Sequence, residues 1–234
     1  VLSGITCGIV GSYIVARRMV FHSSGITHAS FGGLGMALYW GINPLLGALL
    51  FAAISSVGIE FASRRGRIRE DSATGIIWSV GMALGALFMS LRPGYATDLT
   101  SYLFGNILLV TDSDIMWLAL LTLLLVVGAV VWLRKLMYVT FDEEYARSQG
   151  IPVVRVAYIM AMIIAVTIVM SIKVMGIILL LSLVTIPVVV ANALTKDYRA
   201  IAPIAAAIAV VGNIAGFMLS YACDLPTGSC IIFI

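Results

Sequence analysis

Two histidines occupy one polar stretch of a chain that is otherwise strongly apolar. Residues 21–35 read FHSSGITHASFGGLG and hold His22 and His28 among hydroxyls and glycines. In a helix, His28 falls about halfway along this stretch, with Ser24 one turn earlier on the same stripe. Neutral imidazole suits first-row transition metals such as zinc, manganese or iron. The pattern leaves two interpretations of His28 open: a structural histidine bonded to a neighbouring helix, or a transient ligand for a cation moving through the protein.

A tight, permanent metal centre is not indicated. The sequence has no HExxH, no CxxC and no dense carboxylate cluster, and its 3 cysteines cannot form a complete disulfide framework. A permeation path needs no tight site, because an ion that is held strongly would not leave. The pattern therefore argues against a metalloenzyme more than against a transporter. His22 lies nearer the start of the stretch and is expected at the membrane interface.

The composition indicates that lipid is the main solvent. The chain has 234 residues, of which 62% are hydrophobic and 11% charged, whereas about a quarter of a soluble domain is charged. Because a crossing helix needs about 20 apolar residues, we expect an all-α, polytopic transmembrane helical bundle of about eight to nine spans. Complete spans are predicted at 22–40, 44–63, 72–91, 114–133, 153–172, 174–194 and 200–221. Residues 1–16 and 229–234 are read as partial spans of a chain truncated at both ends, and 99–110 as a short re-entrant or interfacial helix.

The basic residues predict which connections face the cytoplasm. Of the 14 Lys and Arg residues, all but Arg92 and Lys173 fall on one alternate set of connections. The excess of Lys and Arg on one side marks the cytoplasmic side of a membrane protein. The ends near 92–98, 173 and 222–228 are therefore expected to face outward. Small residues four apart also predict close helix packing, at Gly4 with Gly8, Gly81 with Gly85, and Gly212 with Gly216.

One cytoplasmic connection has the pattern of a short amphipathic helix. Three acids follow Phe141, and acids in a first turn favour the helix dipole. Gly150 is expected to end this helix, and Pro152 to help start the next span. The segment is either an inert connector or a helix that docks a cytoplasmic partner. Its residues are Phe141, Asp142, Glu143, Glu144, Tyr145, Ala146 and Gly150.

Several segments together resemble the membrane permease subunits of ABC importers for manganese, zinc and iron. They are, in order, GSYIVARRMVF and GITHASFGG, INPLLGALL, REDSATGIIWS, DLTSYLFGNIL, TFDEEYARSQGIP, LSLVTIPVVVANAL and LSYACDLPTGSCIIF, and they cover essentially the whole chain. The resemblance implies a type II importer-like fold and a single permease domain over residues 1–234. In this family the segment 141–150 corresponds to the coupling helix.

The resemblance also implies partners and a metal path. It implies a homodimer or a pair of similar permeases, two ATPase subunits below, and an extracytoplasmic metal-binding protein, in a bacterial cytoplasmic membrane. His28 matches the histidine of the family pattern Asp-x-x-x-His, a metal ligand along the path, and Ser24 stands at the aspartate position. Asp98 and Asp224 are further candidates on the outer side, where Cys223 and Cys230 also lie.

The function expected is import of a divalent transition metal, with ATP used by a partner. The chain has no GxxxxGK[ST] stretch for binding ATP, so we expect neither an enzyme nor a cofactor bound by this chain. The alternative is a proton-coupled secondary cation transporter. That alternative predicts charged residues inside several spans, and besides His28 only Glu60 is a candidate.

Overall fold

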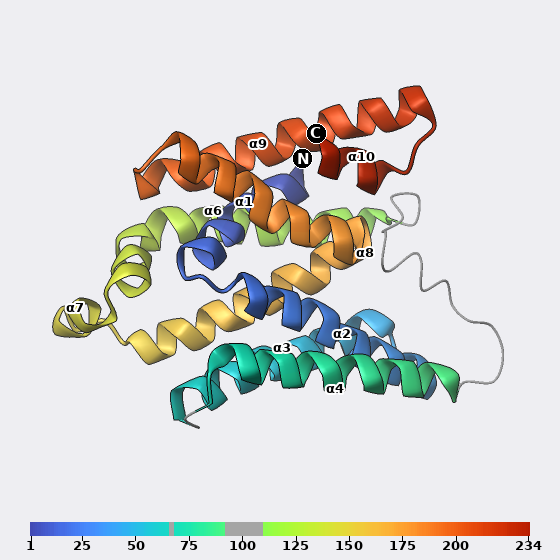
Figure 1. Ribbon diagram of the computed structural model, residues 1–234, viewed down its shortest axis with the longest axis horizontal. Coiled ribbons are helices and arrows are strands. Elements are labelled where there is room, and N and C mark those ends of the chain that lie inside the picture. The colour runs from blue at the N-terminus through green and yellow to red at the C-terminus, as the bar shows by residue number, and fades with distance from the viewer. Residues whose placement is uncertain (66–67, 92–109) are drawn as a thin grey trace. The chain divides into compact units, whose positions relative to one another are not determined.

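The computed structural model describes residues 1–65, 68–91 and 110–234, and within these ranges the chain is helical (Figure 1). The helices are α1 (Leu2–Ala16), α2 (Val20–Trp40), α3 (Pro44–Arg65), α4 (Glu70–Ser90), α6 (Asp112–Phe141), α7 (Glu143–Ser148), α8 (Val153–Leu194), α9 (Tyr198–Cys223) and α10 (Thr227–Phe233). Among the described helices, α3, α4, α6, α8 and α9 are long and apolar enough to cross a membrane. The all-helical membrane bundle predicted from the sequence is therefore confirmed. The predicted segment 99–110 falls almost wholly outside the described residues.

Two predicted boundaries were wrong. The spans 153–172 and 174–194 form one element, α8, whose backbone departs from helical geometry at Gly176 (φ 77°, ψ 168°) and not at Lys173. A positive φ is strained for residues with a side chain, so the interruption falls on the glycine. Lys173 continues the helix and pairs with Asp114 of α6, their Nζ and Oδ2 atoms 2.6 Å apart.

The second wrong boundary is the start of the amphipathic helix. Phe141 is the last residue of α6, and Asp142 then takes an extended conformation (φ −150°, ψ 95°). The carboxylate of Asp142 accepts a hydrogen bond from the backbone N–H of Tyr145 at 2.9 Å and so caps α7. An aspartate cap starts a new helix because its side chain replaces a missing backbone acceptor. Phe141 therefore does not belong to the α7 face.

Contacts within the chain divide it into two compact units. Unit 1 comprises Val1–Met19, Thr100–Val153 and Ser171–Ile234, and unit 2 comprises Val20–Leu99 and Val154–Met170. In unit 1, α1 packs on α9 and α6, and α10 packs on α9. In unit 2, α2 packs on α3 and α4. The single permease domain over residues 1–234 stays a prediction.

Close helix packing is found at two of the three predicted glycine pairs. An added Cβ on Gly81 would lie 2.6 Å from the Ala29 Cα atom, and one on Gly85 would meet Phe31. A Cβ on Gly8 would likewise lie 2.5 Å from the backbone nitrogen of Ala206. In the third pair, Gly212 has open space around its Cβ position, whereas a Cβ on Gly216 would lie 2.5 Å from the Cα atom of Ile231, so only one member of that pair is closely packed. The glycines of the first two pairs thus let helix backbones approach where lipid supplies no hydrophobic drive.

Candidate metal path and coupling segment

His28 lies against α4, with its ring stacked on Trp78. The two ring centroids are 4.8 Å apart, and the planes are inclined by only 10°. The Nδ1 atom of His28 is buried without a hydrogen-bond partner in the described part of the chain. Stacking on an indole therefore holds the imidazole plane while one ring nitrogen lacks a protein partner. A buried polar nitrogen in this state is costly unless water or a cation completes it.

Glycines give the helix pair α2–α4 its close approach. A Cβ on Gly32 would lie 2.7 Å from the carbonyl oxygen of Gly81, and a Cβ on Gly35 would lie equally close to that of Gly85. Ser24, one turn before His28, is buried. The neighbour of His28, Trp78 of α4, was not predicted from the sequence. A lone tryptophan in an apolar span has no periodic signal that marks it as a ring partner.

The side chain of His22 is buried within the protein, with only 1% of it exposed. Its Nδ1 atom lies 3.0 Å from Oε1 of Glu70, a residue in the first turn of α4. The expectation that His22 lies at the membrane interface stays a prediction, because burial within the protein does not fix its depth in the membrane. Glu70 was considered only as part of a charged loop, since no local pattern relates two residues on separate helices.

The described residues contain no group of three or more His, Cys, Asp or Glu side chains that could hold a metal ion together. A cation beside His28 would therefore keep part of its water shell. A partly hydrated ion on few protein ligands binds weakly and can leave, as passage through a membrane requires.

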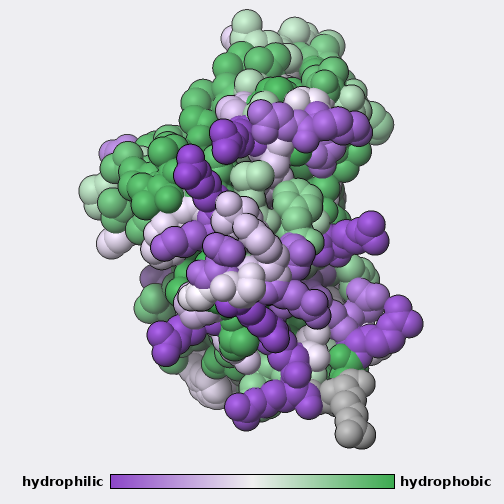
Figure 2. All heavy atoms as spheres, turned by 90° about the vertical axis from the view of Figure 1, so that its left-hand side faces the viewer, coloured by the Kyte–Doolittle hydropathy of each residue, from purple (hydrophilic) through white to green (hydrophobic). Residues whose placement is uncertain are grey.

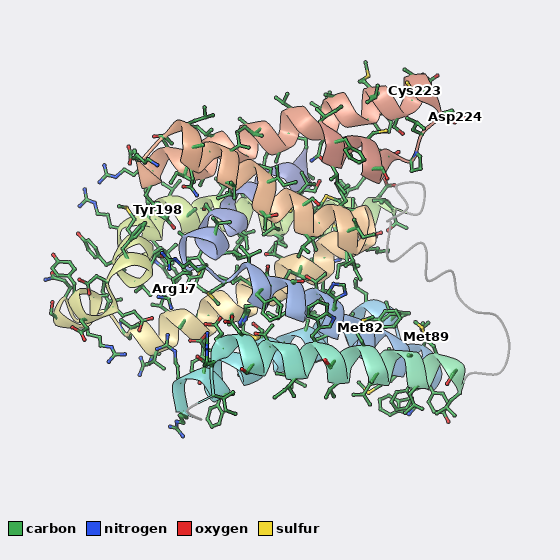
Figure 3. All side chains as sticks on the ribbon, in the orientation of Figure 1. Arg17, Met82, Met89, Tyr198, Cys223 and Asp224 are labelled. Carbon is green, nitrogen blue, oxygen red and sulfur yellow. The ribbon has the colours of Figure 1, made fainter. Side chains whose placement is uncertain are left out.

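The outer-side candidates do not converge in the described residues. Asp98 lies outside the described residues. Asp224 caps the end of α9 in a left-handed conformation (φ 53°), and both it and Cys223 are exposed. Figure 3 shows Cys223 and Asp224 at the end of α9 opposite to Tyr198. Cys230 is buried, and both cysteines are free thiols.

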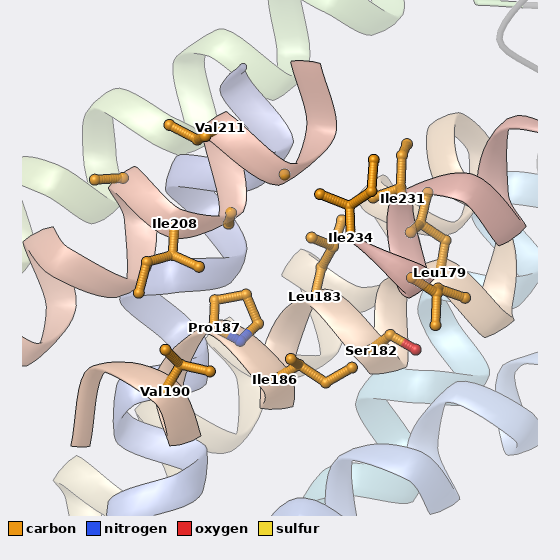
Figure 4. Close-up of a pocket in the computed structure, with 14 residues that line it drawn as sticks. Leu179, Ser182, Leu183, Ile186, Pro187, Val190, Ile208, Val211, Ile231 and Ile234 are labelled. Atoms are coloured by element: carbon orange, nitrogen blue, oxygen red, sulfur yellow. The ribbon is translucent and has the colours of Figure 1, made fainter. Parts of the chain in front are cut away.

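The cavity of unit 1 has none of the side chains that bind transition metals. Its volume is about 430 Å³, and Figure 4 shows it between the second part of α8, α9 and α10. The hydroxyl of Ser182, the polar side chain in its wall, donates to the carbonyl of Ile178 in its own helix. The lining residues are Leu179, Ser182, Leu183, Ile186, Pro187, Val190, Ala207, Ile208, Ala209, Val211, Gly212, Ile231, Ile232 and Ile234.

The segment 141–150 is anchored to unit 1 from one side and exposed on the other. Arg17, which follows α1, donates to Oε1 of Glu143 at 2.8 Å and to the carbonyl of Val139 at 3.0 Å. Ala146 is fully buried, whereas Glu144 and Tyr145 are exposed. Figure 2 faces the side of the molecule on which α7 lies, and hydrophilic side chains gather there.

The ends of the segment are also defined. Phe141 is 65% exposed and packs edge-on against Tyr198 at the start of α9, with ring centroids 5.3 Å apart. Gly150 has a positive φ of 75° and follows the last turn of α7. Of Phe141, Tyr145 and Ala146, only Ala146 is buried. Phe141 and Tyr145 are left largely accessible, and the anchor Arg17 was not anticipated from sequence because it is far away along the chain.

Comparison with known proteins gives one consistent result. The chain matches the ABC 3 transport family over residues 1–234. It is 35% identical to the probable metal transport system membrane protein of Chlamydia trachomatis, over 97% of this chain and 79% of that protein. It is 31% identical to the manganese transport system membrane protein MntC of Halalkalibacterium halodurans, over 100% of this chain and 80% of that protein. Its fold is similar to PsaBC from Streptococcus pneumoniae, solved in complex with Fab, with a TM-score of 0.86 and 25% identity over 99% of this chain and 83% of that one.

Proposed function

The chain belongs to the ABC 3 transport family and is the multi-pass membrane permease of a bacterial ABC metal transport system, and we propose that it imports manganese along a path lined by His28. The name of the relative from Halalkalibacterium halodurans supports manganese as the cargo. Imidazole is also a suitable ligand for zinc and iron, so the ligand type alone does not separate these ions. The observation that carries the proposal is the unpartnered, buried Nδ1 atom of His28.

The ligands of the proposed path are expected to bind the cation with low affinity. Ser24 offers an uncharged hydroxyl where the resembling permeases have an aspartate, and His28 offers one or two ring nitrogens. Water supplies the remaining ligands of the cation. Such a site favours divalent ions that accept nitrogen, and it releases them when the surrounding helices move.

Energy for transport comes from ATPase subunits, as in other ABC systems. We propose that α7 docks on such a subunit through its exposed residues, Glu144 and Tyr145, together with Phe141. Arg17 and the buried Ala146 tie α7 to unit 1. Movement of α7 during ATP binding would then reach α1, α6 and α9, which opens the path to one side of the membrane at a time. A second permease, identical or similar, and an extracytoplasmic metal-binding protein complete the proposed assembly.

A proton-coupled secondary transporter is the second candidate, and the structure gives it less support. Glu60, the carboxylate inside α3, is buried but pairs with Arg64 of the same helix. The ion pair with Arg64 gives Glu60 a structural role within α3, which accounts for this carboxylate without proton transport. The anchored α7 also has no role in a self-powered carrier.

The test is metal uptake by cells or vesicles that contain the full transporter. Manganese, zinc and iron are offered separately, and wild type is compared with His28→Ala and with Ser79→Ala. The Ser79 hydroxyl bonds its own helix backbone, to the carbonyl of Gly75, so Ser79→Ala is a matched control. We expect manganese uptake in wild type and control and its loss in His28→Ala, with the complex still assembled. Unchanged uptake in His28→Ala would contradict the proposed path.

A further inference from the structure

His22 has the arrangement of a metal-binding histidine, although it lies outside the pattern that singled out His28. Its Nδ1 atom lies 3.0 Å from Oε1 of Glu70. Metal-ligating histidines commonly present one ring nitrogen to the metal while the other faces a carboxylate, which fixes the tautomer and raises ligand basicity. The Glu70 carboxylate lies at ion-pair distance from Nδ1, so Nε2 is the ring nitrogen left for another ligand.

The other ring nitrogen of His22, Nε2, has no structural role that accounts for its burial. It is buried and has no hydrogen-bond partner among the described residues. An acceptor nitrogen enclosed without a donor costs free energy, so such groups usually serve a ligand, a water or an ion. His22 therefore combines an oriented ring with an unoccupied, buried acceptor.

The position of His22 relative to His28 suits a second station on one path. Both histidines lie on α2, six residues apart, which is about 9 Å along a helix axis. Both rings contact α4, His22 through Glu70 and His28 through Trp78. Two weak stations at this separation allow an ion to move from one to the next without a tight intermediate.

We propose that His22, oriented by Glu70, is a second ligand for the transported divalent cation through its Nε2 atom. This inference rests on the proposed function, since it assigns a further station to the same path. Glu70 also brings a negative charge to His22, two residues before Ser24, where the chain has a hydroxyl and the resembling permeases have an aspartate. Glu70 acts here as a positioning residue, while His22 contacts the ion.

Spectroscopy of bound manganese tests the ligand directly. The chain has 2 histidines, so in the His28→Ala background an imidazole of this chain that touches the ion must be His22. The ATPase-bound permease is loaded with Mn²⁺ in that background, and pulsed EPR detects nitrogen coupled to the ion. We expect a nitrogen signal that disappears in His28→Ala/His22→Asn. Subtracting the spectrum of His28→Ala/His22→Asn from that of His28→Ala removes any signal from histidines of other subunits. An identical nitrogen signal in these two variants would overturn the proposal.

Uptake by the complete transporter gives an independent readout. His22→Asn keeps an amide donor near the Nδ1 position, so Glu70 retains a partner, but it removes Nε2. We expect the KM for Mn²⁺ to rise roughly tenfold or more in His22→Asn, and by about the same factor in Glu70→Gln. The control is Ser23→Ala, whose hydroxyl bonds the Val20 carbonyl of its own helix, and its KM should equal that of wild type.

The outcomes separate this inference from the proposed function. Absence of ATP-dependent manganese uptake in assembled wild type would overturn the proposed function. Normal uptake in wild type with an unchanged KM in His22→Asn would overturn the His22 station alone. If His22→Asn does not assemble, the nitrogen signal of His28→Ala, which keeps His22, decides. A signal that is present with native Glu70 and lost in Glu70→Gln supports the station. Absence of the signal with native Glu70 overturns it.

Discussion

At the scale of single residues, the proposed metal path depends on the contacts that α4 makes with two side chains of α2. Trp78 stacks on His28, and Glu70 faces His22. In each imidazole a buried ring nitrogen remains without a hydrogen-bond partner among the described residues. A helix that carries such nitrogens is expensive to bury in a plain packing role. The proposed path accounts for this cost, because both nitrogens would serve as transient ligands of the cation.

If Ser24 belongs to the proposed path, its exchange for aspartate should change the affinity and the rate of transport in opposite ways. Ser24→Asp adds a charged oxygen one turn from His28, so the cation binds more tightly and leaves more slowly. We expect a lower KM for manganese together with a lower maximal rate, each by a factor of several. Initial rates across a range of manganese concentrations measure both. Ser24→Asn, of the same shape without charge, should leave the rate close to wild type, and a raised maximal rate in Ser24→Asp would contradict this account.

At the scale of elements, glycines set the distance between α2 and α4. Gly32→Ala would place a Cβ 2.7 Å from the backbone oxygen of Gly81, so the helices must separate at a cost of about 1–3 kcal/mol. We expect a lower thermal unfolding midpoint for the purified permease. Gly75→Ala on α4 is the matched control, because nothing lies within 4 Å of its Cβ position and alanine favours a helix. Equal midpoints for the two variants would rule out the close approach.

The anchor of α7 is a second element that can be tested. Arg17→Ala removes two hydrogen bonds from a charged donor, each worth about 1.5–3 kcal/mol, and frees α7 from unit 1. We expect the number of metal ions taken up per ATP hydrolysed to fall several-fold, because hydrolysis would no longer be coupled to movement of the permease. Arg147→Ala serves as the control, since Arg147 is more exposed and lies 3.7 Å from Glu143. A normal uptake-to-ATP ratio in Arg17→Ala would show that this anchor does not transmit the movement.

Particular residues show how far the sequence predicted these elements. The span 44–63 was close to α3, because hydrocarbon length alone defines such a helix. Lys173 misled the prediction of a break, since a charge in an apolar run resembles a loop until Asp114 pairs with it. Phe141 was predicted to belong to the amphipathic helix, but it ends α6. Its aromatic neighbour Tyr198 belongs to another helix, so the sequence near Phe141 does not show this contact. Glu70 and Trp78 could not be assigned to the site, because their roles depend on contacts between helices.

At the scale of the whole molecule, the charges of unit 1 agree with a membrane orientation. Arg17 and Tyr198 lie toward the α7 end of unit 1, and Asp224 lies at the opposite end of α9 (Figure 3). The ion pair of Lys173 with Asp114 involves the first turn of α6, the end away from Phe141. The basic residues near α7 accord with the cytoplasmic side predicted from the sequence. Lys173, one of the two basic residues predicted outside, is paired there with Asp114.

The driving force of transport is the central claim, and one flux measurement tests it. The complete transporter is reconstituted in vesicles with its metal-binding protein, and manganese accumulation is followed with ATP and no pH gradient, then with a pH gradient and no ATP. The account predicts accumulation only with ATP, and its loss in His28→Ala under the same conditions. Accumulation that follows the pH gradient without ATP would contradict the account and favour a proton-coupled carrier.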